Sequence, residues 1–265
     1  RVRAAVGAGL LAHFQGDDEQ ARTWLDASAR QARDLGDPWL LAFALLLVGM
    51  VAEDRGDYRL AAERFAEALT RFQAADDRAN AALALTHLGV AAWGLGDVQR
   101  AADFWDEALA LQRAADDAWG VANSLGYLGL LAAERGDERQ AAIFHRESLV
   151  LRYETEAWED VAGSLADLAA LAARTGRPEQ AARLFGAAAA LREQAGRSLK
   201  LPERAVFERA EAQARAALGP DAFVAATAAG RTLPCEQAIA EAAALAEAIA
   251  RDCDGRRCGQ PVGSS

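Results

Sequence analysis

The chain has 265 residues, of which 52% are hydrophobic, and it is therefore long enough to bury a sizeable core. Its formal net charge of −10 argues against direct binding to nucleic acid, which needs concentrated lysine and arginine. No apolar run approaches the ~20 residues of a membrane span, and no signal peptide is recognisable, so we expect a cytoplasmic protein without membrane contact. Abundant alanine, with only 7% aromatic residues, favours helices throughout.

One sequence pattern recurs along the chain with a period of 40 residues, at 45–69, 85–109 and 125–149. Each copy predicts a pair of helices, roughly four to five turns each, joined by a tight turn. The glycine of this turn is present in five copies: Gly16, Gly56, Gly96, Gly136 and Gly176. Glycine ends a helix in the left-handed conformation at little cost, and the aspartate that follows it can cap the next helix. A fixed period of this length is typical of helical repeats.

Further columns keep the same register. A small residue precedes each turn, at Gly9, Gly49, Gly89, Gly129 and Ala169. A large residue follows each turn, at Leu25, Phe65, Trp105, His145 and Phe185. Small residues let two helices approach closely, and the large residues are expected to fill the space between them.

These columns resemble the tetratricopeptide repeat, in which a Leu-Gly pair, an alanine, an aromatic residue and another alanine stand at fixed offsets. Leu88-Gly89, Ala101, Trp105 and Ala108 match this pattern. The resemblance covers about residues 2–197 and implies an all-α, right-handed superhelix of about five helix pairs. We therefore assign residues 1–200 to repeats.

The period stops at Pro202. Three further helices are expected, ending near Gly219, Gly230 and Ala250, and they would cover the apolar face of the last repeat. We assign residues 201–250 to this helical cap and residues 251–265, which are rich in glycine and arginine, to a disordered tail or linker.

The sequence contains no recognisable catalytic or metal-binding motif. It lacks a phosphate-binding loop, a His-x-x-x-His pair and a nucleophile elbow, so we expect neither an enzyme nor a bound cofactor. His145 stands in the large-residue column, which favours a packing role. Cys235, Cys253 and Cys258 are odd in number and are interpreted as free thiols.

A binding surface remains as the candidate site. In a superhelix of helix pairs the first helix of each pair lines the concave face, and residues three to four positions apart share one side of it. The resulting groove is largely apolar with a few polar side chains, as is typical of ligand sites. The candidate residues are Trp39, Phe43, Met50, His87, Trp93, Trp119, Asn123, Tyr127, Asp167 and Arg174. Packing of Trp39, Trp93 and Trp119 between neighbouring first helices, without any ligand, is the alternative.

The stretch Ala181–Ile249 resembles the C-terminal sensor region of LuxR-type and MalT-like signal-transducing ATPase regulators. This resemblance implies a non-enzymatic sensor that binds an inducer or a protein partner in the groove and acts on a neighbouring ATPase or DNA-binding domain. The chain begins at Arg1 rather than Met, so we expect it to be part of a longer parent chain, in which the resemblance implies such neighbouring domains. The alternative function is a free-standing scaffold for protein–protein interaction.

Overall fold

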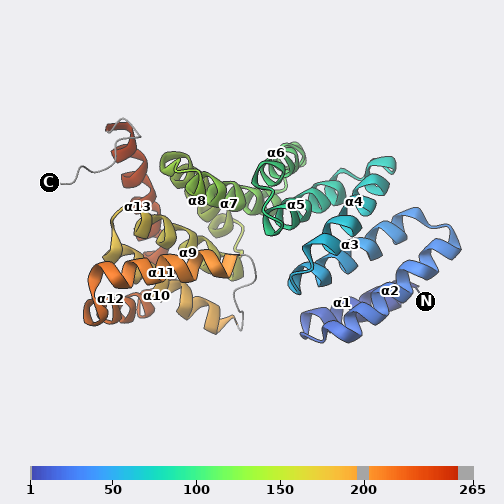
Figure 1. Ribbon diagram of the computed structural model, residues 1–265, viewed down its shortest axis with the longest axis horizontal. Coiled ribbons are helices and arrows are strands. Elements are labelled where there is room, and N and C mark those ends of the chain that lie inside the picture. The colour runs from blue at the N-terminus through green and yellow to red at the C-terminus, as the bar shows by residue number, and fades with distance from the viewer. Residues whose placement is uncertain (1, 196–202, 256–265) are drawn as a thin grey trace. The chain divides into compact units, whose positions relative to one another are not determined.

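A computed structural model describes residues 2–195 and 203–255, and within these ranges the chain forms thirteen helices and no strand (Figure 1). The helices are α1 (Val2–Phe14), α2 (Asp18–Leu35), α3 (Pro38–Asp54), α4 (Tyr58–Ala74), α5 (Arg78–Gly94), α6 (Val98–Ala114), α7 (Ala118–Glu134), α8 (Glu138–Glu154), α9 (Trp158–Arg174), α10 (Pro178–Gln194), α11 (Glu203–Leu218), α12 (Pro220–Arg231) and α13 (Cys235–Gly255). The first ten helices form the five predicted pairs. The chain divides into two compact units, residues 1–120 and residues 121–265.

The repeat period governs helix length. Each helix from α3 to α10 contains 17 residues, which is between four and five turns at about 3.6 residues per turn. The all-α prediction and the predicted helix lengths are therefore confirmed.

The turn within each pair has the expected chemistry. Its glycine has φ between 73° and 83° in every copy, a conformation that strains residues with a Cβ atom. In the first four copies the next residue, Asp17, Asp57, Asp97 or Asp137, accepts a hydrogen bond from a backbone N–H three residues on. In the fifth copy Arg177 makes no such bond, and Pro178 begins the helix instead.

The turn between pairs shows a regularity that the sequence did not suggest. Its left-handed position is Gly36 in the first copy, but Asp76, Asp116 and Glu156 in the next three, with φ of 51°, 53° and 55°. Aspartate tolerates this conformation better than glutamate, because its short side chain can bond to the local backbone. Glu156 is therefore the most strained of the four positions.

We expect Glu156→Gly to raise the free energy of unfolding by roughly 0.5–1 kcal/mol. Glycine removes the steric cost of the left-handed backbone conformation, but its greater conformational entropy in the unfolded chain offsets part of this gain. Urea denaturation of the variant beside the wild type measures this difference. Asp76→Gly is the matched comparison and should gain less. Destabilisation by Glu156→Gly would show that the carboxylate, rather than the backbone, matters here.

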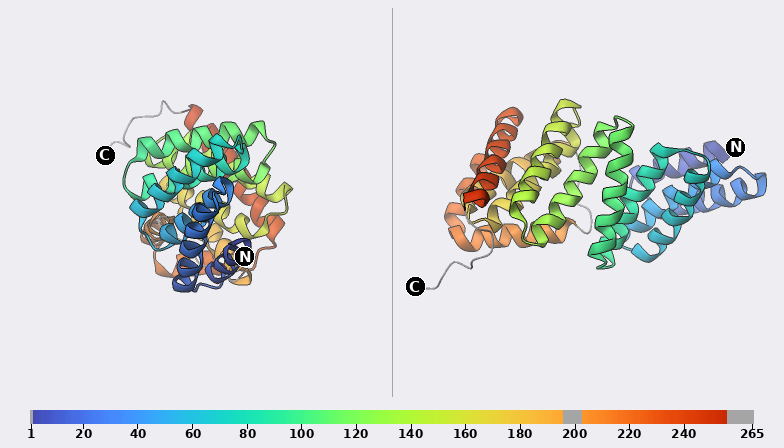
Figure 2. Two further views of the ribbon diagram at one scale, coloured as in Figure 1. Left: turned by 90° about the vertical axis from the view of Figure 1, so that its right-hand side faces the viewer. Right: turned by 90° about the horizontal axis from the view of Figure 1, so that it is seen from above.

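Within residues 1–120 each helix lies beside the next along the chain (Figures 1 and 2). The small residues before each turn contact the large residues after it, as predicted. A Cβ atom added at Gly49 would stand 2.5 Å from the Phe65 ring, and one at Gly89 would stand 2.2 Å from Nε1 of Trp105. Both large side chains are fully buried. The missing Cβ atoms thus create the space that the rings occupy.

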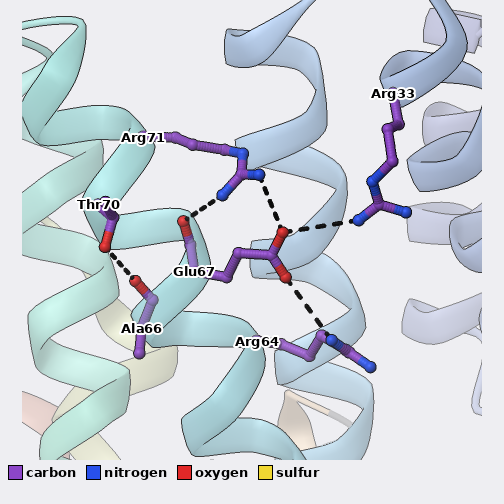
Figure 3. A network of polar contacts seen from close by, with 6 residues as sticks. All are labelled: Arg33, Arg64, Ala66, Glu67, Thr70 and Arg71. Carbon is purple, nitrogen blue, oxygen red and sulfur yellow. Dashed lines mark hydrogen bonds and ion pairs between the residues drawn. The ribbon is translucent and has the colours of Figure 1, made fainter.

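A polar network ties α4 to α2 at the surface (Figure 3). The Glu67 carboxylate on α4 lies 3.0 Å from Arg71, 3.7 Å from Arg64 and 3.6 Å from Arg33 of α2. These side chains are partly exposed, so each pair contributes little by itself. We interpret the network as a contact that aligns the two helices.

Within residues 121–265 the cap helices cover the last two pairs. Helix α11 packs against α9 and α10, α12 against α10, and α13 against α8, α9 and α10. Arg183 on α10 donates to both carboxylate oxygens of Glu241 on α13, at 2.7 and 3.0 Å. The predicted tail begins inside a helix, because α13 continues to Gly255. Residues 256–265 lie outside the described residues.

The tightest helix contact is between α10 and α12. A Cβ atom added at Gly230 would stand 1.8 Å from the backbone oxygen of Arg183, and one added at Gly186 would stand 2.1 Å from that of Thr227. Two glycines therefore let the two backbones touch.

Candidate functional site

A pocket of about 90 Å³ lies within residues 121–265. Its walls come from α7, α9 and α11, and the buried His145 of α8 also lines it. Leu130 of α7 and Ala170 of α9 stand at the same repeat position 40 residues apart, so the pocket follows the first-helix faces that the sequence predicted to line a groove. We refer to it as the α7–α9–α11 pocket.

His145 forms part of the pocket's buried floor. Its side chain is 1% exposed and packs on Gly129, where an added Cβ atom would stand 2.5 Å from the imidazole Cε1. Burial and the nearby charge of Arg152 lower the pKa of His145 from 6.5 to about 3. The ring is therefore neutral at physiological pH, and the 3.8 Å approach of its Nδ1 to the Asp167 carboxylate is not an ion pair. Among the residues that the structure describes, Nδ1 has no hydrogen-bond partner.

Arg152 organises the polar groups beside this floor. It donates to Oδ1 of Asn123 on α7 at 2.9 Å and to Oγ of Ser164 on α9 at 2.7 Å. A Cβ atom at Gly126 would lie 3.7 Å from the guanidinium. In the previous copy the equivalent residue, Gln112, donates to the Thr86 hydroxyl. The last turn of the second helix thus carries polar side chains that bind the first helices.

The mouth of the pocket is rich in donors. Arg174 donates to the backbone oxygen of Ala133 at 2.6 Å, and the Gln213 amide donates to that of Ala173 at 3.2 Å. These bonds anchor both side chains at the rim. Arg209, one turn before Gln213 on α11, is exposed there too.

The structure brings together only part of the predicted site in residues 121–265. Asp167 and Arg174 line the pocket. Asn123 is committed to Arg152, which gives it a structural partner. Tyr127 is half-buried and does not line the pocket.

The other predicted residues belong to residues 1–120. Trp39 is 40% exposed, stacks on Phe43 with ring centroids 5.4 Å apart, and donates from Nε1 to Asp77 at 2.8 Å. Trp119, at the start of α7, is 48% exposed. Met50 is half-buried against the core.

His87 and Trp93 make specific contacts inside the same unit. His87 Nδ1 lies 3.1 Å from the Glu53 carboxylate, and the ring stacks on Phe65. Trp93 is buried and meets Trp105 edge-on, with centroids 6.1 Å apart. Trp93 thus packs against the second helix of its own pair, α6.

Sequence reasoning missed the wall that α11 supplies. Val206, Arg209, Ala210 and Gln213 line the pocket at helical spacing. This spacing marks one face of a helix but does not reveal its neighbour, because α11 lies outside the repeat period. His145 was assigned to packing alone, and nothing in the sequence placed it beside Asp167.

Residues 2–195 and 203–255 contain no cluster of three or more histidine, cysteine or acidic side chains suited to a metal ion. In the same ranges no helix combines the length and hydropathy needed to cross a membrane.

Neither a protein-family model nor a curated protein matches the sequence. Solved structures nevertheless define the class of fold, an all-α helical repeat of the tetratricopeptide type, and thereby confirm that prediction. BtubC (BKLC) from P. vanneervenii is 22% identical, with 73% of this chain and 80% of that chain covered and a TM-score of 0.58. The apo form of RapI is 12% identical, with 82% of each chain covered and a TM-score of 0.59. The Rap conjugation gene regulator of plasmid pLS20, solved in complex with the Phr* peptide, is 12% identical, with 94% of this chain and 74% of that chain covered and a TM-score of 0.57.

The titration of His145 makes a testable contribution to stability. Since the unfolded ring binds a proton near pH 6.5 and the folded ring only near pH 3, the unfolded state holds more protons between these values. Stability must then fall as the pH drops through this window. From pH 7 to pH 5 the wild type should lose about 2 kcal/mol more than His145→Phe, which keeps the ring packing of Phe65 and Phe185.

Urea unfolding of both proteins at several pH values measures this difference, because all other titrating groups are shared. Equal pH dependence of wild type and variant would contradict a buried, neutral His145.

Proposed function

We propose that this chain is a non-enzymatic sensor domain of a bacterial transcriptional regulator, acting in the cytoplasm. The observation that carries the proposal is the α7–α9–α11 pocket, which combines apolar walls with a buried His145 and Asp167 and a donor-rich mouth. A concave, mostly apolar site with a few convergent polar groups is suited to binding a ligand. Occupation of the pocket would couple to neighbouring ATPase or DNA-binding domains of a longer chain.

Two further points support the proposal. The stretch Ala181–Ile249, which includes most of α10, all of α11 and α12 and most of α13, is where the sequence resembles a regulator's sensor region. The conjugation gene regulator of similar fold was solved with a bound peptide. Helix α11 joins the cap to the pocket, so a ligand there would contact both repeat and cap. A change in cap packing is then a direct way to report binding.

The second candidate function is a scaffold for protein partners. Trp39 and Trp119 remain 40% and 48% exposed at the starts of α3 and α7. Exposed tryptophan is common at protein interfaces, because it offers a large contact area at small entropic cost.

Thermal unfolding in the presence of fractionated bacterial extract separates the two functions. A ligand that binds only the folded state raises the melting midpoint. The sensor function predicts a rise with the small-molecule fraction for the wild type and none for His145→Phe. A rise with the macromolecular fraction alone, equal in both proteins, favours the scaffold. No rise with either fraction contradicts both functions.

A further inference from the structure

The floor of the α7–α9–α11 pocket presents two buried groups that can accept from one donor. The side chains of His145 and Asp167 are 1% and 9% exposed, and Nδ1 lies 3.8 Å from the carboxylate oxygen. A nitrogen about 2.9 Å from both atoms would bridge them. The carboxylate accepts up to about four hydrogen bonds, so Asp167 can accept from a guest in addition to its contacts within the protein. Because Nδ1 is buried without a hydrogen-bond partner in residues 2–195 and 203–255, a bound donor would remove the penalty of that unsatisfied atom.

The mouth of the pocket offers hydrogen-bond donors, whereas the floor offers acceptors. Arg174 and Gln213 are held there by bonds to backbone oxygens, and Arg209 adds a second guanidinium. Glu134 also lies at the mouth. Guanidinium groups pair well with carboxylates, since their N–H groups match the two carboxylate oxygens. The mouth therefore suits the anionic end of a guest.

Charge and size restrict the guest further. The lining contains two acidic side chains, Glu134 and Asp167, and two basic ones, Arg174 and Arg209. Their formal charges cancel, so the pocket suits a molecule without net charge. The walls between floor and mouth are apolar. A volume of about 90 Å³ is far below the roughly 300–1,000 Å³ of pockets for drug-sized ligands. The guest must therefore be small.

We propose that this pocket binds a small amino-carboxylate zwitterion. Its amine donates to His145 Nδ1 and to the Asp167 carboxylate, its short carbon chain lies between α9 and α11, and its carboxylate meets Arg209 and Arg174. This inference rests on the proposed sensor function and gives it a ligand class.

The test uses the full chain and defined probes: glycine, β-alanine and γ-aminobutyrate, with propylamine and propionate as single-function controls. At least one zwitterion should raise the thermal midpoint by roughly 2 °C or more and give single-site binding by calorimetry. Propylamine and propionate should each give less than half of that shift. Equal or larger shifts with either control would overturn the zwitterion assignment.

Three variants locate the site. His145→Phe keeps the packing found in other repeat copies and should abolish the shift. Arg209→Ala, an exposed change on α11, should weaken binding roughly tenfold or more, the loss expected of a charge-assisted pair. Arg204→Ala removes an arginine of the same helix that does not line the pocket, and it should bind like the wild type. Amino acids that stabilise proteins non-specifically would shift all four proteins alike, and that result would overturn the proposal.

The outcome is distinguishable from failure of the sensor function. If no probe acts, but the small-molecule extract fraction raises the midpoint of wild type and not of His145→Phe, the ligand class is wrong and the sensor function stands. If neither probes nor extract act, both proposals fail.

Discussion

Gly230→Ala is expected to lower the free energy of unfolding of residues 121–265 by roughly 3 kcal/mol, the upper end of the usual cost of overpacking. The added methyl carbon would stand 1.8 Å from the Arg183 backbone oxygen and 2.7 Å from its carbonyl carbon. Neither atom belongs to a flexible side chain, so the methyl group can be accommodated only if α10 and α12 move apart. Urea unfolding followed by far-ultraviolet circular dichroism measures the loss.

Gly163→Ala on α9 is the matched control. The nearest atom to its added Cβ is 3.5 Å away, an ordinary contact, and alanine favours the helix by up to about 1 kcal/mol. This variant should be as stable as the wild type or slightly more stable. Gly186→Ala, on the facing helix, should resemble Gly230→Ala.

The double variant Gly186→Ala/Gly230→Ala tests the mechanism. Once one methyl group has separated the helices, the second should cost less than it does alone, so the two losses should not add. Full additivity, or a melting midpoint of Gly230→Ala equal to that of the wild type, would contradict the backbone contact described between α10 and α12.

Trp105→Ala should destabilise residues 1–120 by roughly 3–5 kcal/mol. The Trp105 ring is fully buried, meets Trp93 edge-on, and donates from Nε1 to the Thr86 backbone oxygen at 2.9 Å. Gly89 leaves no side chain that can fill the resulting cavity. The loss of stability therefore has two parts: the hydrophobic free energy of burying the ring, and the cost of the cavity that the missing ring leaves.

Two comparisons separate these contributions. Trp105→Phe restores a ring of the kind found at Phe65 and Phe185 and should cost about 1–2 kcal/mol, since it loses the hydrogen bond and part of the volume. Trp24→Ala, at a side chain that is 44% exposed, should cost less than about 1 kcal/mol. Circular dichroism is the appropriate probe because the substitutions change tryptophan fluorescence directly. A loss below about 1 kcal/mol for Trp105→Ala would contradict the packing of the large column.

Local signals determined much of this protein from its sequence. The 40-residue period, the turn glycines and the capping aspartates act within a few residues of each other, and for that reason helix number, helix length and the pairing of Gly89 with Trp105 were predictable. The same pattern occurs in each repeat copy, so every copy supports the prediction independently. The positions of backbone strain could not be predicted in the same way. Glu156 occupies the left-handed position that Gly36 has in the first copy, and no local sequence pattern indicates this.

The tertiary structure decided the rest of the candidate site. Asp167 and Arg174 were predicted from helical spacing on the first helices, but His145 and Arg209 joined them only through contacts between α8, α9 and α11. The cap lies outside the repeat period, and no local rule states which face of a repeat a non-repeating helix will cover. Packing of α11 against α9 and α10, rather than the repeat, supplies the pocket's third wall.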